Sequence, residues 1–111
     1  MGYIPTRIVG PYNLIDDYQA VYVAQSKTIM KQILLSNVTG TAANVRIAIT
    51  GFQGSPSSIN AIMQDVEIEA NSTLVADIVQ VLEVSDKLYA RCSISGAINL
   101  TVSGIVQEET E

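Results

Sequence analysis

Hydrophobic and polar residues alternate over most of the chain, and the clearest example lies near its C-terminal end. Between Leu88 and Ile94 every second residue is apolar, and the same alternation runs from Ile98 to Val102. A short turn that contains Gly96 separates the two segments. Period-two alternation interrupted by a glycine turn is typical of two strands with one buried face each. We therefore expect residues 88–102 to form a β-hairpin.

Further segments with the character of strands follow one another from Tyr18 onward, separated by polar turns. They cover residues 18–25, 28–37, 44–51, 59–70 and 73–84, before the predicted hairpin and a last strand that ends at Val106. The piece from Ile78 to Val84 fits a helical turn and a continuing strand equally well. Seven or eight short strands without a convincing helix indicate an all-β fold, a small antiparallel β-sandwich or jelly roll. The last strand should lie beside an earlier one, as Greek-key closure requires.

The alternation also assigns faces to the strands. In segment 28–37 it places Ile29 with Ile33 and Leu35 on one face, and Met30 with Leu34 on the other, as in a central strand covered on both sides. The residues predicted to form the core are Ile33, Leu35, Val45, Ile47, Ile49, Leu88, Ile98, Leu100 and Val102. Arg46 is predicted to face outward.

The first 17 residues differ from the rest, because they mix apolar residues with Pro5 and Pro11 and show no sustained period. Proline restricts itself and its predecessor to extended geometry, so residues 1–17 are predicted as an extended N-terminal arm. The β-sandwich domain then covers residues 18–107, and residues 108–111 form an acidic tail. The arm's apolar and tyrosine side chains are predicted to dock on a neighbouring subunit: Tyr3, Ile4, Ile8, Val9, Tyr12, Leu14 and Ile15. The alternative is that the same residues form an edge strand of their own subunit.

Composition adds exclusions. At 111 residues the chain is one domain, and it contains no histidine, so triads, metal sites and proton shuttles built on histidine are excluded. No glycine-rich phosphate loop matches either. The single Cys92 lies on an inward face and is interpreted as a buried hydrophobic residue. We therefore predict no enzyme, no catalytic residue and no cofactor.

Two groups of carboxylates were considered as ion sites. Asp65, Glu67 and Glu69 alternate along one segment, which is typical of a solvated strand face, with a weak Ca²⁺ site as the alternative. Asp16-Asp17 is interpreted as a cap of the turn into the first strand. No metal ligand is predicted at either place.

The net charge of −5 is distributed unevenly. Residues 1–60 contain four basic and two acidic side chains, giving +2, whereas residues 61–111 contain two basic and nine acidic ones, giving −7. Nucleic-acid binding requires clustered Lys and Arg, so no nucleic-acid partner is expected. No apolar run is long enough to span a membrane, and the protein is not expected to bind a membrane.

Several motifs resemble small structural proteins of tailed-bacteriophage virions. They are "VAQSKT" leading into "IMKQILLSNVTGTAANVRIAIT", then "STLV", "VSDKLYA" and "AINLTVSGI", and the similarity covers roughly Ala20 to Val106. Ser85 stands where those proteins often have a glycine before the aspartate. The resemblance implies a non-enzymatic virion component such as a capsid decoration, head-fibre base, neck or tail-tip protein.

The expected partners are further copies of the chain, in a trimer or a larger ring, and other virion proteins. The argument for self-assembly is an apolar content that exceeds what one small sandwich can hide, together with long strand edges that need covering. The alternative function is a stand-alone receptor- or carbohydrate-binding β-sandwich module. A sugar-binding module usually presents an exposed aromatic platform, and this chain offers little beyond its tyrosines.

Overall fold

The computed structural model describes residues 2–51 and 53–107, and this part of the chain is built almost entirely from β-strands. The elements are β1 (Tyr3–Asn13), β2 (Gln19–Val23), β3 (Thr28–Asn37), β4 (Ala43–Thr50), the 3₁₀ turn η1 (Ser58–Asn60), β5 (Ala61–Ile68), β6 (Thr73–Ala76), β7 (Gln80–Leu82), β8 (Lys87–Cys92) and β9 (Ile98–Gln107). The predicted all-β sandwich is confirmed. No helix in the described residues is long and apolar enough to cross a membrane. The predicted acidic tail lies outside the described residues.

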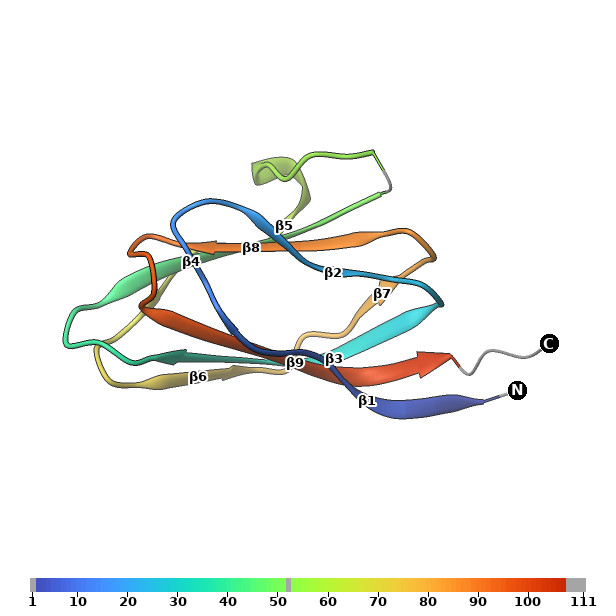
Figure 1. Ribbon diagram of the computed structural model, residues 1–111, viewed down its shortest axis with the longest axis horizontal. Helices are drawn as coiled ribbons and strands as arrows, with labels where there is room; N and C mark the ends of the chain where they lie inside the picture. Colours follow the sequence, from blue (N-terminus) through green and yellow to red (C-terminus); the bar gives the residue numbers. More distant parts are fainter. Residues whose placement is uncertain (1, 52, 108–111) are drawn as a thin grey trace.

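The strands form two antiparallel sheets that lie one above the other (Figure 1). Sheet A has the order β1-β9-β3-β6, with β7 also paired to β3, and sheet B has the order β2-β8-β4-β5. Since β6 and β7 pair with successive parts of the same side of β3, they are two halves of one interrupted strand. The segment from Ile78 to Val84 therefore continues as a short strand rather than a helical turn.

This strand order identifies the sandwich as a jelly roll. Each early strand pairs with a late one, β1 with β9, β2 with β8, β3 with β6 and β7, and β4 with β5. A long antiparallel ribbon rolled into two sheets gives this nesting of pairs. As a result β1 begins and β9 ends at the same end of the sandwich (Figure 1).

The core fills the space between the sheets. Eight of the nine residues predicted to form the core are fully buried, and Ile49 is half-buried against the same cluster. Arg46 faces outward while Ile47 is fully buried, so the predicted register of β4 is confirmed. Cys92 is also buried in the core, as predicted.

The predicted hairpin of residues 88–102 is wrong. Strand β8 pairs with β2 and β4 in sheet B, whereas β9 pairs with β1 and β3 in sheet A. The turn at residues 93–97 crosses from one sheet to the other, with Ala97 buried inside it. Alternation reports which face is buried, but two strands that face the same core from opposite sheets show the same pattern as a hairpin.

The predicted faces of β3 also need correction. Met30 pairs with Gly104 and Gln32 with Ser103, so Lys31 is an extra residue in β3. This β-bulge shifts the alternation by one position, as bulges do. Met30 consequently joins Ile33 and Leu35 in the core, and Ile29 lies on the outer face. Met30 therefore adds no apolar surface to the outer face of β3.

Residues 3–14 belong to the domain rather than to a separate arm. Strand β1 pairs with β9 along its length, and Leu14 continues the contact because its N–H donates to the carbonyl of Ile98 (2.8 Å). Val9 and Leu14 are buried in the core. The expectation that this segment stands outside its own core is corrected, and the edge-strand alternative describes it. The physical reason is that β9 would otherwise expose an unpaired edge.

Candidate functional site

A bulge in β5 creates a polar site on the outer face of sheet B. Val45 pairs with Val66 and Ile47 with Met63, so Gln64 and Asp65 together lie opposite one residue of β4. Asp65 adopts a left-handed conformation (φ 54°), which is characteristic of such irregular positions. The bulge therefore redirects the Asp65 carboxylate toward the neighbouring strand.

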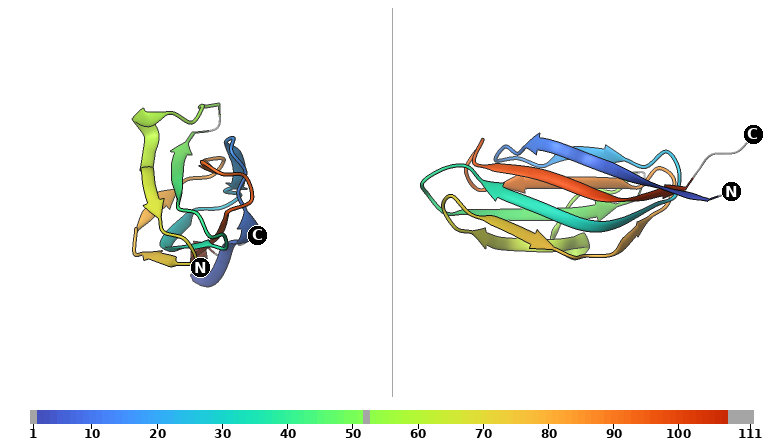
Figure 2. Two further views of the ribbon diagram at one scale, coloured as in Figure 1. Left: turned by 90° about the vertical axis from the view of Figure 1, so that its left-hand side faces the viewer. Right: turned by 90° about the horizontal axis from the view of Figure 1, so that it is seen from below.

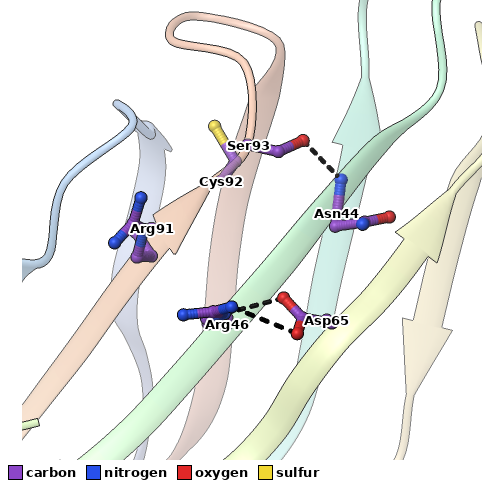
Figure 3. Close-up of a pocket in the computed structure, with 6 residues that line it drawn as sticks. All are labelled: Asn44, Arg46, Asp65, Arg91, Cys92 and Ser93. Carbon is purple, nitrogen blue, oxygen red and sulfur yellow. Dashed lines mark hydrogen bonds and ion pairs between the residues drawn. The ribbon is translucent and has the colours of Figure 1, made fainter. Parts of the chain in front are cut away.

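Arg46 on β4 binds this carboxylate through two nitrogens of its guanidinium group. Its Nε donates to Oδ1 of Asp65 at 2.7 Å and its Nη2 donates to Oδ2 at 3.2 Å (Figure 3). A forked pair of this kind fixes both groups in orientation. The hydrogen bonds from Arg46 hold the pKa of Asp65 below its ordinary value, and the Asp65 carboxylate in turn raises the pKa of Arg46.

A second arginine lies directly beside the first. Arg91 on β8 pairs in register with Arg46, and like charges opposite each other repel. Arg91 turns away, donating from Nη2 to the carbonyl of Asp16 at 2.7 Å, with its guanidinium 5.6 Å from the ring centre of Tyr18. Tyr18 meets Tyr89 edge to face at 6.4 Å between ring centres. Two arginines are thus accommodated around one carboxylate.

Arg46, Asp65 and Arg91 line a shallow hollow of about 380 Å³. Its other lining residues are Asn44, Cys92 and Ser93 (Figure 3). The Ser93 hydroxyl oxygen accepts the N–H of Asn44 at 2.9 Å, which joins the rim of β8 to the start of β4. One carboxylate against two guanidiniums leaves the hollow with one excess positive charge.

Three groups at this site have pKa values that are shifted away from neutral pH. Burial raises the pKa of the Cys92 thiol, whose Sγ donates to the carbonyl of Ile94 at 2.9 Å. Asp65 is held ionised and Arg46 is held charged. General acids and bases need a pKa near the working pH, and these groups have moved in the opposite direction. The arrangement is suited to binding and orienting a charged group.

The predicted carboxylate groups have separate fates. Asp65 binds Arg46, while Glu67 and Glu69 line a shallow depression of about 170 Å³ with Ser72 and Thr73. Within the described residues, no three acidic or cysteine side chains come close enough to hold a metal ion. The carboxylate of Asp17 accepts the N–H of Tyr18 at 2.9 Å, which is the turn cap expected there.

The predicted docking residues are not one surface. Val9 and Leu14 are buried, and Ile8 and Tyr12 are half-buried against the core. Tyr3 and Ile4 are exposed at the start of β1, and Ile15 is exposed beyond its end. Ile4 also lines a groove of about 670 Å³ between β1 and β2, whose lining is both apolar (Val21, Tyr22, Val23, Val106) and polar (Thr6, Gln25, Ser26, Gln107).

The Arg46–Asp65 pair was missed by the sequence analysis, although its two residues were placed outward on neighbouring segments. Opposite charges on successive strands are the signal that points to such a pair. The bulge that brings them into contact depends on the tertiary structure, and the alternation of apolar and polar residues does not predict it.

Comparisons with known proteins give information about the fold only. No family model and no curated protein matches the sequence. Among solved structures, the chain is similar to one in the structure of infectious bursal disease virus Gx strain, with a TM-score of 0.53 and 14% sequence identity. The match covers 98% of this chain and 33% of that one, so this chain spans about a third of the length of the virus chain. The jelly roll is thus shared with a chain from a virus structure.

Proposed function

We propose that the chain is a non-enzymatic structural protein of a virion that assembles as a homo-oligomer on a tailed-phage particle. The observation that carries the proposal is the jelly-roll strand order, which extends over the described chain and is shared with a chain of a virus structure. Jelly rolls recur in viral capsids, where two covered sheets give a rigid block with little exposed edge. The motifs between Ala20 and Val106 support the assignment to tailed phages, as a capsid decoration or a head- or neck-associated component.

The site on sheet B supports a structural role. Its charged groups are fixed in a forked ion pair or bonded to backbone, and its perturbed pKa values keep them in one protonation state. An enzyme site usually contains titratable groups tuned toward neutral pH. The hollow is therefore best described as a rigid binding surface rather than as a catalytic one.

Docking on the particle uses the exposed start of β1. Tyr3 and Ile4 present large side chains there beside the groove between β1 and β2, and such residues are enriched at interface cores. The sheet edges contribute through side chains more than through backbone, because Pro5 and Pro11 interrupt the ladder that β1 offers to a new strand.

The test is made on washed tailed particles from the phage whose genome encodes the chain. We expect mass spectrometry to find the chain in them at a fixed copy number, and light scattering of the purified chain to give a homo-oligomer. Absence from washed particles would overturn the virion role. A monomer at high micromolar concentration, with and without its virion partners, would overturn the homo-oligomer.

A second candidate function, receptor or carbohydrate binding, is favoured by the two tyrosines beside the hollow. It ranks lower because Arg91 already lies over the ring of Tyr18, which reduces the platform open to a sugar. Calorimetric titration with a panel of saccharides decides between the two. Binding that is lost in Tyr18→Ala supports the module, and no binding at millimolar sugar excludes it.

A further inference from the structure

The outer face of sheet A has a banded pattern that follows from its registers. Figure 2 shows the four strand positions of this face side by side, in the order β1, β9, β3 and β6. One apolar row crosses the sheet where β1 begins: Pro5, Ile105, Ile29 and Val81. A second row, four residues from the first along β9, contains Thr101, Leu34 and Val75. Between them lies a polar row formed by Arg7, Ser103, Gln32 and Asp77.

The burial pattern places these rows on the outside. Thr28 and Met30 are fully buried on either side of Ile29, and Leu82 is buried next to Val81. Val75 is 52% exposed and Val81 is 48% exposed, in strands whose outward positions are normally polar. An apolar group of this kind on an open sheet face is characteristic of an interaction surface.

The edges of the sheets are less suitable for contact between copies. The β1–β9 ladder shifts register twice, β2 shifts once and β5 shifts twice. The remaining edge is divided between β6 and β7. Interrupted edges of this type resist the addition of a further strand.

We propose that two copies of the chain pack through the outer faces of their A sheets, related by a two-fold axis parallel to the strands. Such an axis keeps each row level with itself and reverses the order of the strands. Ile105 then meets the partner's Ile29, and Pro5 meets the partner's Val81. This isologous contact rests on the self-assembly in the proposed function and identifies one surface that performs it.

The positions of charged residues favour this axis over a two-fold axis that lies in the interface but runs perpendicular to the strands. Arg7 and Asp77 stand at opposite ends of the polar row, so reversing the strands places Arg7 over the partner's Asp77. An axis perpendicular to the strands would place Arg7 over the partner's Arg7, which is repulsive. Within the described part of its own chain the side chain of Arg7 makes no hydrogen bond or ion pair, and the carboxylate of Asp77 accepts only the amide of Gln32 at 3.2 Å.

The size of the face agrees with a modest dimer. Four strand positions about 4.8 Å apart and ten residues of about 3.3 Å each give roughly 630 Å² per copy. Two copies would bury about 1,250 Å² in total, at the lower end of the range for specific interfaces. We therefore expect a dissociation constant of the order of micromolar rather than nanomolar.

The test is sedimentation equilibrium of the full chain, with thermal melts to show that each variant folds. We expect Val81→Lys to raise the dissociation constant roughly tenfold or more. Val84→Lys is the matched control, since Val84 is 60% exposed in the turn after β7 and lies outside the rows, and it should leave dimerisation unchanged. Equal effects of the two substitutions would overturn the proposal, as would a monomeric wild type at several hundred micromolar.

Charge reversal tests the axis. Arg7→Glu and Asp77→Lys should each weaken the dimer several-fold, and the double variant should restore it. Arg7 and Asp77 are three strand spacings apart, about 14 Å, so the restoration cannot arise within one copy. Additive losses in the double variant would overturn this arrangement. If the chain is a monomer but still binds its particle, the dimer proposal is refuted and the virion role is retained. If it is a dimer but is absent from particles, only the virion role is refuted.

Discussion

Leu14 and Ile15 are neighbours in the chain with opposite environments. Leu14 is fully buried between the sheets, and Ile15 is 36% exposed. Leu14→Ala should lower the free energy of unfolding by about 2–5 kcal/mol, because the side chain leaves a cavity that the core cannot close. Ile15→Ala should change it by less than about 0.5 kcal/mol. Urea denaturation of both variants measures this difference, and equal effects would contradict the assignment of Leu14 to the core.

Ser85 occupies a backbone conformation that suits glycine. Its φ of 78° is in the left-handed region, where residues with a Cβ are strained. Glycine, which has no Cβ, adopts this conformation without that strain. Ser85→Gly should raise the free energy of unfolding by up to about 1 kcal/mol, even though glycine increases the entropy of the unfolded chain. A loss of stability in thermal melts would show that this turn does not need glycine.

Asp65 provides a prediction about pH. Its pKa lies below its ordinary value of 3.8 because it accepts hydrogen bonds from Arg46. A carboxylate with a lowered folded pKa contributes stability that is present above its unfolded pKa and lost as the pH falls through the folded one. The contribution should therefore disappear below pH 3.8. Carbon-detected NMR titration should show the midpoint of Asp65 rising in Arg46→Gln and rising less in Arg91→Gln, and an unchanged midpoint in Arg46→Gln would refute the pairing.

At the scale of elements, alternation predicted where strands lie and which residues they bury. It placed Val45, Ile47 and Leu100 correctly, because a strand with one buried face must alternate. It could not predict partners, so β8 and β9 were interpreted as a hairpin although they belong to different sheets. It also could not predict the bulge at Lys31, because a bulge arises from the fit of β3 to its neighbours.

That bulge has a consequence for β9. A Cβ at Gly104 would overlap the carbonyl oxygen of Ile29 on β3, since the two backbones approach closely there. Gly104→Ala should therefore cost about 1–3 kcal/mol, as forced overpacking does. Ser103→Ala, one residue earlier on the outer face, serves as the control and should be within about 0.5 kcal/mol of the wild type. Equal stability of the two variants in chemical denaturation would show that β3 moves aside without cost.

At the scale of the whole molecule, the candidate site illustrates the limit of reasoning from sequence. Arg46 and Asp65 were both placed on solvent-facing positions, and the structure agrees. Their contact depends on β4 and β5 being neighbours and on a bulge between them, and both are properties of the folded jelly roll. The same holds for the rows on sheet A, where Ile29, Val81 and Ile105 come from three separate parts of the chain.

The role of the N-terminal strand in docking requires a test that leaves the fold intact. Deletion of residues 2–15 is unsuitable, because it would remove Val9 and Leu14 from the core. Tyr3 pairs with Gln107, so a short Gly-Ser linker can join β9 to β1, with new ends placed between Ser55 and Pro56 in an exposed loop. All the strand pairs of the jelly roll survive in this circular permutant. It should fold with near-native thermal stability and keep the contact through sheet A.

The permutant should nevertheless bind the particle weakly. In it the linker is attached directly to Tyr3, and it covers the end of the molecule where the groove between β1 and β2 opens. Co-sedimentation with particles measures binding. The control for the linker itself is the chain in its natural order with the same linker inserted after Gly40, in the loop between β3 and β4. If the permutant folds and binds as well as the natural chain, docking does not use the start of β1. If it fails to fold, the close pairing of Tyr3 with Gln107 is not enough to hold the jelly roll together.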